Sequence, residues 1–224
     1  TDGQLQLSNQ LFYAKLIQRI ISFLSSVTGC GYAYKLDTRL RPSGNAGVLV
    51  TTISSFAAYH QQSKPWEHQA LINARVVGGD LDEKWRVSVD KLLSKSAYEW
   101  EIPDDLHLKI AHLRGRKEEE LSGETFEQKN LKEGKGGLLD IEFLTQYLQL
   151  KFVQRFPKLR TTETLKALEV IGKEALISQE EVIFLEKAYR WIRQIETALR
   201  LLFDQSVNTL NLNKAQTLHL ETLL

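Results

Sequence analysis

The most constraining feature of the sequence is a long segment with helical periodicity near its C-terminal end. Ser178 and Glu181 form the Ser-x-x-Glu pattern of a capping box, in which each side chain pairs with the backbone N–H of the other residue. Apolar side chains then recur in steps of three and four, at Val182, Leu185, Tyr189, Ile192, Ile195, Leu199 and Leu202. These steps put one apolar stripe on one helix face, and such a stripe must be covered. The segment therefore predicts a helix at the seam of a helical bundle.

Most of the remaining chain also has the periodicity of helices. Residues 9–24 have an apolar stripe, and Ser54 or Ser55 is a suitable cap for a helix reaching Gln62. Further helices are expected over residues 66–77, 82–96, 104–121, 138–156 and 161–171. Residues 122–137 are polar and glycine-rich, so they are expected to form a loop or linker.

Two short segments have the pattern of β-strands. Residues 32–37 alternate, with Tyr32, Tyr34 and Leu36 on one face. Residues 48–52 are rich in β-branched side chains, and a turn containing proline and glycine precedes them. The predicted fold class is therefore α+β, with a small α/β part over residues 1–80 and a helical bundle over residues 81–224.

The composition excludes several classes of function. The net charge of +1 gives no electrostatic reason to expect nucleic-acid binding. No apolar run approaches the ~20 residues of a membrane span, and the polar start has no signal-peptide pattern. The one cysteine, Cys30, cannot form an internal disulfide, which favours a reducing, cytoplasmic compartment. Because the sequence contains no methionine and begins with Thr1, we expect a fragment, or a sequence from which methionines are missing.

One stretch, Asp-Thr-Arg-Leu-Arg-Pro-Ser-Gly-Asn-Ala-Gly, has the pattern of a phosphate site. It begins with Asp37, a carboxylate at the end of a predicted strand that can hold a divalent metal. Arg39 and Arg41 occupy alternate positions, so both would project from the same side of an extended backbone towards phosphate oxygens. Ser43 and Gly44 form a turn whose backbone N–H groups can bind an anion. The alternative interpretation is a surface ion pair between Asp37 and Arg39 beside an ordinary turn.

This stretch resembles the D-x-R-L-R-P-x-G-x-x-G signature of the glutamine synthetase adenylyltransferase family. The segments Trp66–Leu71 and Ala74–Val77 resemble the next block of that family. Gly136–Phe143, together with Gln146-Tyr147-Leu148, resembles its third block. The three blocks occur in the family's order and cover most of residues 9–156, whereas residues 157–224 match only in helical character.

Enzymes of this family contain two related halves, and the resemblance implies the half that transfers AMP from ATP to a tyrosine of glutamine synthetase. Ser43 after Arg-Pro, His68-Gln69 after Trp-Glu, and Asp140 before Ile-Glu-Phe are the residues that favour this half. The implied partners are glutamine synthetase and a PII-type nitrogen signal protein. Three alternatives remain: the half that removes AMP by phosphorolysis, a non-catalytic helical module that docks on either partner, and a related uridylyltransferase. The Arg-Leu-Arg-Pro and Trp-Glu-His-Gln blocks argue against the last of these.

The resemblance also implies a polymerase-β-type nucleotidyltransferase fold, whose site holds Mg²⁺ with three carboxylates. Asp37 matches the third carboxylate, as metal ligand and candidate base, and the same resemblance makes Arg39, Arg41, Ser43 and Gly44 nucleotide contacts. The Gly-Ser-Asp-x-Asp motif that supplies the first two carboxylates is absent from this sequence. We therefore expect these 224 residues to be inactive alone.

Four further charged residues are candidates for a supporting role at the site. Glu67 and Arg75 lie eight residues apart on one expected helix, which favours a structural ion pair over a place in the site. Asp140 and Glu142 lie at an expected helix N-terminus, where capping or a salt bridge to the α/β part is favoured. The five histidines have no zinc-type spacing with cysteines, so no zinc site is expected.

Overall fold

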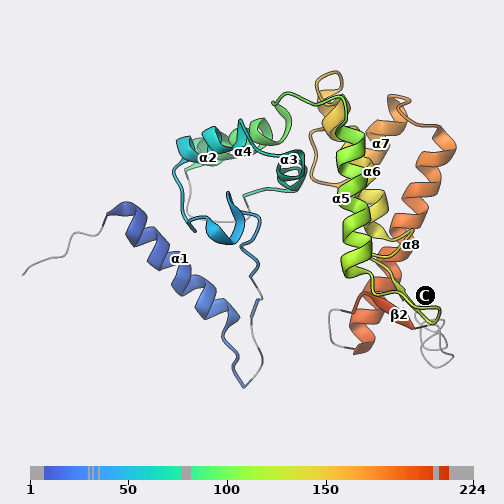
Figure 1. Ribbon diagram of the computed structural model, residues 1–224, viewed down its shortest axis with the longest axis horizontal. Coiled ribbons are helices and arrows are strands. Elements are labelled where there is room, and N and C mark those ends of the chain that lie inside the picture. The colour runs from blue at the N-terminus through green and yellow to red at the C-terminus, as the bar shows by residue number, and fades with distance from the viewer. Residues whose placement is uncertain are drawn as a thin grey trace, which may run out of the picture. The chain divides into compact units, whose positions relative to one another are not determined.

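The computed structural model describes residues 8–29, 31, 33–34, 36–76, 82–203 and 207–211. The chain divides into two compact units, an N-terminal unit, Thr1–Ser63, and a C-terminal unit, Lys64–Leu224. Figure 1 shows the first in blue to cyan and the second from cyan to red. Among the described residues, no helix is long and apolar enough to cross a membrane.

The described part of the N-terminal unit contains two α-helices and one short 3₁₀ turn. They are α1 (Asn9–Ser25), η1 (Gly44–Ala46) and α2 (Ile53–His60). The helix predicted over residues 9–24 is confirmed, but α1 buries none of its side chains among the described residues. Thr52, rather than Ser54 or Ser55, caps α2, because its hydroxyl accepts a hydrogen bond from the Ser55 N–H at 3.1 Å.

The two strands expected in this unit are not present in the part of the chain that the structure describes. Residues 33–34, 36–37 and 48–52 are irregular, and Tyr32 and Lys35 lie outside the described residues. A strand needs a neighbouring backbone with which to pair. The Tyr34 N–H instead donates to the Leu24 carbonyl at 2.9 Å, at the end of α1. Asp37 therefore follows an irregular segment rather than a strand.

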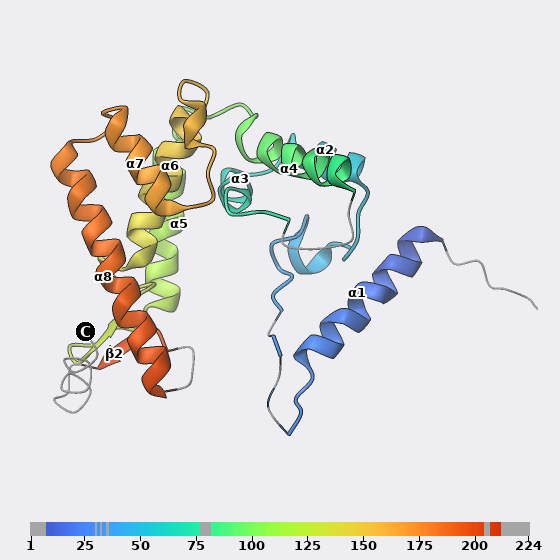
Figure 2. The same cartoon turned by 180° about the vertical axis from the view of Figure 1, so that it is seen from behind.

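The C-terminal unit is a bundle of helices with one small sheet (Figures 1 and 2). Its elements are α3 (Pro65–Leu71), α4 (Glu83–Tyr98), α5 (Leu106–Leu121), β1 (Gln128–Asn130), α6 (Leu138–Phe152), η2 (Pro157–Leu159), α7 (Thr164–Lys173), α8 (Gln179–Phe203) and β2 (Thr209–Asn211). Strands β1 and β2 pair antiparallel, with Lys129 opposite Leu210. Helices together with this sheet agree with the predicted α+β class.

The core of the bundle lies where α6, α7 and α8 pack together, and Figure 2 shows these helices side by side. Its fully buried side chains include Leu150, Val153, Leu159, Leu168 and Ile171, whereas Leu199 belongs to a smaller separate cluster. The predicted capping box opens α8, because the Ser178 hydroxyl accepts from the Glu181 N–H and the Glu181 carboxylate accepts from the Ser178 N–H. Four positions of the predicted stripe are buried, namely Val182, Ile192, Ile195 and Leu199, whereas Leu202 is exposed.

The largest difference from the expected helices lies at residues 66–77. Helix α3 ends at Leu71, and residues 72–76 turn away from the helix axis. Ile72 is buried in the core at this turn, and Asn73 is a weak helix former. Helix α3 packs against α4, α5 and α6. The observed division lies between Ser63 and Lys64, whereas the predicted boundary lay at residue 80. Residues 64–80 thus belong to the C-terminal unit, and 77–80 of them lie outside the described residues.

Candidate functional site

The loop from Asp37 to Gly47 is folded around the guanidinium group of Arg41. Arg41 Nη1 donates to the Thr38 carbonyl at 2.6 Å and to its hydroxyl at 2.9 Å. Arg41 Nε donates to the Gly47 carbonyl at 3.1 Å, and Nη2 donates to the Asn45 carbonyl at 3.3 Å. One side chain thus joins both ends of the loop. Arg41 stabilises the loop conformation with most of the N–H groups that were expected to contact phosphate.

The structure explains why the signature has glycine at positions 44 and 47. Gly44 has φ +54°, in the left-handed region that glycine adopts without strain, and it follows Ser43 at φ +60°. A Cβ atom on Gly47 would lie 1.9 Å from the Pro42 carbonyl oxygen, so no larger residue fits. The Ser43 N–H donates to the hydroxyl of Tyr59 at 3.1 Å, which ties the turn to α2. This N–H, which was expected to bind an anion, therefore has a partner within the protein.

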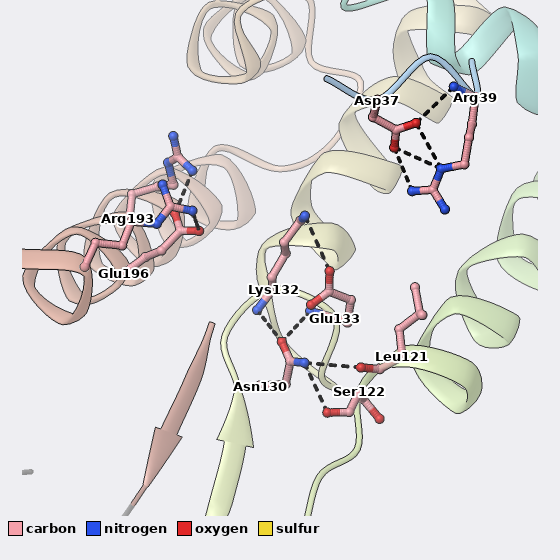
Figure 3. Close-up of polar contacts among 10 residues, drawn as sticks. Asp37, Arg39, Leu121, Ser122, Asn130, Lys132, Glu133, Arg193 and Glu196 are labelled. Atoms are coloured by element: carbon pink, nitrogen blue, oxygen red, sulfur yellow. Dashed lines mark hydrogen bonds and ion pairs between the residues drawn. The ribbon is translucent and has the colours of Figure 1, made fainter. Parts of the chain in front are cut away.

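Asp37 and Arg39 form a two-point ion pair on the surface (Figure 3). Arg39 Nη2 lies 2.6 Å from Asp37 Oδ2, and Arg39 Nε lies 2.9 Å from Oδ1. The backbone N–H of Arg39 also donates to Oδ1 at 2.9 Å. The side-chain hydrogen bonds from Arg39, followed by its backbone N–H, lower the pKa of Asp37 to about 2. The geometry is thus that of the surface ion pair considered as the alternative.

Arg39 and Arg41 do not project together from an extended backbone. Residues 39–42 form a turn, so the alternation expected for a strand does not apply. The side chain of Arg39 is 74% exposed, whereas Arg41 is half-buried in its loop. Of the two, Arg39 is the guanidinium that a ligand in solvent can reach.

The described residues do not by themselves fit a pair of magnesium ions. The described ranges contain no group of three or more His, Cys, Asp or Glu side chains that could hold a metal ion. Asp37 is the one carboxylate of the loop, and both of its oxygens accept hydrogen bonds from Arg39. A metal site needs ligands besides Asp37, and a metal at Asp37 must compete with the Arg39 guanidinium.

Glu67 and Arg75 do not lie on one helix as expected, because α3 ends at Leu71. Glu67 caps α3, since its carboxylate accepts a hydrogen bond from the Lys64 N–H at 2.8 Å. Arg75 lies in the following turn, where it lines a pocket with Tyr98. The inference that these two residues share a helix face is therefore wrong.

Asp140 lies in the first turn of α6, as expected, and makes a salt bridge within the bundle. Its Oδ1 lies 2.6 Å from Nε of Arg114 on α5, and Arg114 is buried. Its Oδ2 accepts from the Gly136 N–H at 2.6 Å. The expected salt bridge thus exists, but its partner belongs to the bundle rather than to the α/β part. Sequence reasoning did not single out Arg114.

Among the glutamates of the bundle, Glu142 is partly buried and Glu196 is buried. Burial raises the pKa of Glu142, and the Tyr189 hydroxyl lies 3.4 Å from its carboxylate. Glu196, which sequence reasoning missed, is 2% exposed and pairs with Arg193 at 2.7 Å (Figure 3) and with Arg200 at 2.6 Å. The sequence signal for this cluster is the spacing of Arg193, Glu196 and Arg200 in steps of three and four, which places them on one face of α8.

Comparison with protein-family models gives two matches that divide the chain. Residues 1–89 match the model described as glutamate-ammonia ligase adenylyltransferase. Residues 104–222, more than half of the chain, match the model described as GlnD PII-uridylyltransferase. The chain belongs to the GlnD PII-uridylyltransferase family, whose model covers more than half of it, and its residues 1–89 are similar to glutamate-ammonia ligase adenylyltransferase. The expected resemblance to the adenylyltransferase family is confirmed by the match of residues 1–89, which contains the first two sequence blocks. The third block, Gly136–Phe143, lies instead within the PII-uridylyltransferase match.

The two family matches cover different groups of the charged residues described above. The loop with Asp37 and Arg39 lies within the adenylyltransferase match. Helices α5 to α8, with the Arg114–Asp140 and Glu196 ion pairs, lie within the PII-uridylyltransferase match. Both models describe nucleotidyltransferases, so nucleotidyl transfer is the reaction class that the matches support.

We expect Asp37 to titrate near pH 2. Replacing Arg39 by glutamine removes the main cause of the lowered pKa, so the pKa of Asp37 should return towards 3.8. Because the folded-state pKa is lowered, the stabilisation by the pair is complete above about pH 3.8 and is lost as the pH falls through about 2. Carboxyl chemical shifts in an NMR titration measure both values, and equal pKa values in the two proteins would contradict the ion pair.

Proposed function

We propose that this chain is part of an enzyme that transfers AMP from ATP to a tyrosine of glutamine synthetase. The observation that carries the proposal is the Asp37–Gly47 loop, whose signature falls within the match to glutamate-ammonia ligase adenylyltransferase. The loop has a fixed conformation, held by Arg41 and required by Gly47. It presents an exposed carboxylate and an exposed guanidinium side by side.

Within this proposal the residues of the loop have different roles. Arg39 is the phosphate contact, because its guanidinium fork fits phosphate oxygens as well as it fits the Asp37 carboxylate. Arg41 shapes the loop, and Ser43 and Gly44 form the turn beside the nucleotide. Asp37 supplies one carboxylate towards Mg²⁺, with the remaining ligands outside the described residues. A polymerase-β-type fold belongs to the same proposal.

The choice between the AMP-attaching and the AMP-removing half rests on the motif variants. Ser43 follows Arg-Pro, as in the attaching half, and lies in the loop itself. His68 and Gln69 are buried, with the His68 ring stacked on Trp100 at 4.1 Å and Gln69 bonded to Gln146. His68 and Gln69 therefore contribute to packing, and Ser43 is the distinguishing residue that lies in the proposed nucleotide loop.

The match of residues 104–222 favours a second candidate function. A bundle that resembles PII-uridylyltransferase suits a docking module for a PII-type signal protein. In this alternative the bundle binds the signal protein and transfers no nucleotide. The two candidates differ in their targets, so one assay separates them.

The deciding assay offers two nucleotides and two acceptor proteins. The natural reading frame that contains these residues is incubated with ATP or UTP, with glutamine synthetase or a PII-type protein, and with Mg²⁺. We expect label transfer only from ATP to glutamine synthetase, and a loss of about tenfold or more for Asp37→Asn. Asp105→Asn, which removes an exposed acid paired with Lys109 in the bundle, is the matched control.

The outcomes of this assay exclude one another. Transfer of UMP to the PII-type protein, or full activity of Asp37→Asn, would overturn the proposal. Binding of a PII-type protein without any nucleotide transfer would favour the docking module. The 224 residues alone are expected to be inactive, and AMP transfer by them would contradict that expectation.

A further inference from the structure

The C-terminal unit contains a pocket of about 290 Å³ that has no part in the proposed transfer chemistry. Three segments form it: the turn after α3, the second half of α4 and the residues after η2. Its polar lining consists of Arg75, Asp90, Ser94, Tyr98, Arg160 and the hydroxyl pair Thr161-Thr162. Apart from Asp90, these polar side chains can all donate a hydrogen bond.

Tyr98 is the most deeply buried polar residue among those that line this pocket. It is 4% exposed, and its hydroxyl oxygen is buried with no hydrogen-bond partner in the part of the chain that the structure describes. Leaving a buried polar group unpaired costs free energy, so such a group in a pocket wall is a sign of a missing partner. Burial also raises the pKa of Tyr98 to about 12, so the hydroxyl keeps its proton and remains a donor at neutral pH.

Two guanidinium groups lie in the same wall. Arg160 lies over the Tyr98 ring, 5.9 Å from its centroid, and makes one ion pair at 3.4 Å with Glu99. Arg75 has no hydrogen bond or ion pair with any described residue. Asp90 is the one acidic residue of the lining. Among the residues that line the pocket, the positive charges of Arg75 and Arg160 exceed the one negative charge of Asp90, while Glu99 pairs with Arg160 from outside the lining.

We propose that this pocket binds a small oxyanion, a carboxylate or phosphate group, held by Arg75, Arg160 and the Tyr98 hydroxyl. Guanidinium forks bind both groups through paired charge-assisted hydrogen bonds. The hydroxyl supplies a third donor from the buried side. The ligand satisfies the Tyr98 oxygen that the protein alone leaves without a partner.

Binding of inorganic phosphate and of malonate to the 224-residue protein tests the proposal, with chloride at equal ionic strength as the blank. We expect saturable binding of at least one of the two anions in calorimetric titration. Arg160→Gln should weaken that binding by about tenfold or more, because a charge-assisted contact is lost. Tyr98→Phe should weaken it by about threefold or more, since one neutral donor is lost.

Two control variants separate binding from packing. Arg155→Gln removes a guanidinium that also lies over an aromatic ring, at 5.1 Å from the Phe156 centroid, but does not line the pocket. Tyr147→Phe removes a hydroxyl that accepts a hydrogen bond from Lys151 elsewhere in the bundle. Both control proteins should bind the anion as tightly as the unchanged protein.

The results for phosphate and malonate identify the source of the oxyanion. Binding of phosphate alone assigns the pocket to a phosphorylated compound, and binding of malonate alone assigns it to a carboxylate. Without ligand, Tyr98→Phe should leave the unfolding temperature unchanged or raise it, because it removes an unpaired buried hydroxyl. Absence of saturable binding, or equal weakening by the control and pocket variants, would overturn the proposal.

Discussion

Replacing Gly137 by alanine is expected to destabilise the C-terminal unit by about 3 kcal/mol or more. A Cβ atom at Gly137 would lie 2.9 Å from each of three backbone carbonyl oxygens, those of Leu131, Lys132 and Gly134. These carbonyls cannot move aside freely, because they accept hydrogen bonds from the N–H groups of Leu138, Leu139 and Gly137 itself. These N–H groups belong to the start of α6, where no partner within the helix exists. The substitution therefore produces either a clash or an uncapped helix.

The backbone conformation of Gly137 is not the cause of this effect. Its φ of −80° is one that alanine adopts without strain, so the cost is steric. Gly115→Ala is the matched control, since Gly115 lies within α5 with no atom within 4 Å of the added Cβ. This control should stabilise the unit by roughly 0.5–1 kcal/mol.

Urea unfolding followed by tryptophan fluorescence measures both proteins. The four tryptophans, Trp66, Trp85, Trp100 and Trp191, all belong to the C-terminal unit, so the signal reports on this unit alone. A loss below 1 kcal/mol for Gly137→Ala would mean that the loop before α6 relaxes easily, contrary to the dense hydrogen bonding described above.

The helices could be predicted because their signals are local. The capping box at Ser178 and the apolar steps after it determine where α8 begins and which face it buries. By contrast, the sheet pairs Gln128–Asn130 with Thr209–Asn211, two short segments far apart in sequence and without β-type periodicity. The residues 32–37 have that periodicity, yet the described residues of their unit provide no strand to pair with. Alternating periodicity indicates only that a segment could have one apolar face, whereas a strand also needs a neighbouring strand with which to form hydrogen bonds.

The sequence predicted the turn of the Asp37–Gly47 loop but not the contacts within it, and the roles of its residues in a site stay a prediction. The signature correctly drew attention to Asp37, Arg39 and Gly47 as a folded loop. The assumption of an extended backbone directed Arg41 towards phosphate, whereas in the structure Arg41 donates hydrogen bonds to carbonyls of its own loop. A guanidinium has five N–H donors, and the sequence alone does not reveal whether carbonyls of the same loop or a ligand will use them.

Arg114→Met is expected to destabilise the C-terminal unit by about 2–4 kcal/mol. Arg114 Nε lies 2.6 Å from Asp140 Oδ1, and its Nη2 donates to the Gly134 carbonyl at 2.8 Å. The Arg114 side chain is 9% exposed, so water replaces these partners poorly after the substitution. The estimate stays below the largest values for broken buried pairs, because the Asp140 side chain is 38% exposed and can be partly solvated. The same fluorescence-detected urea unfolding measures this change.

Arg116→Met, two positions later on α5, is the control that separates the effect of burial from the loss of a positive charge. Arg116 is 56% exposed and pairs with Glu120 at 2.7 Å, so Arg116→Met should cost far less stability than Arg114→Met. Asp140→Asn should be largely non-additive with Arg114→Met if the two residues act as one pair. Equal costs at Arg114 and Arg116 would contradict the role of the buried pair. If Asp140→Asn instead abolished nucleotidyl transfer without lowering stability, Asp140 would act in the chemistry of the site rather than in the packing of the bundle.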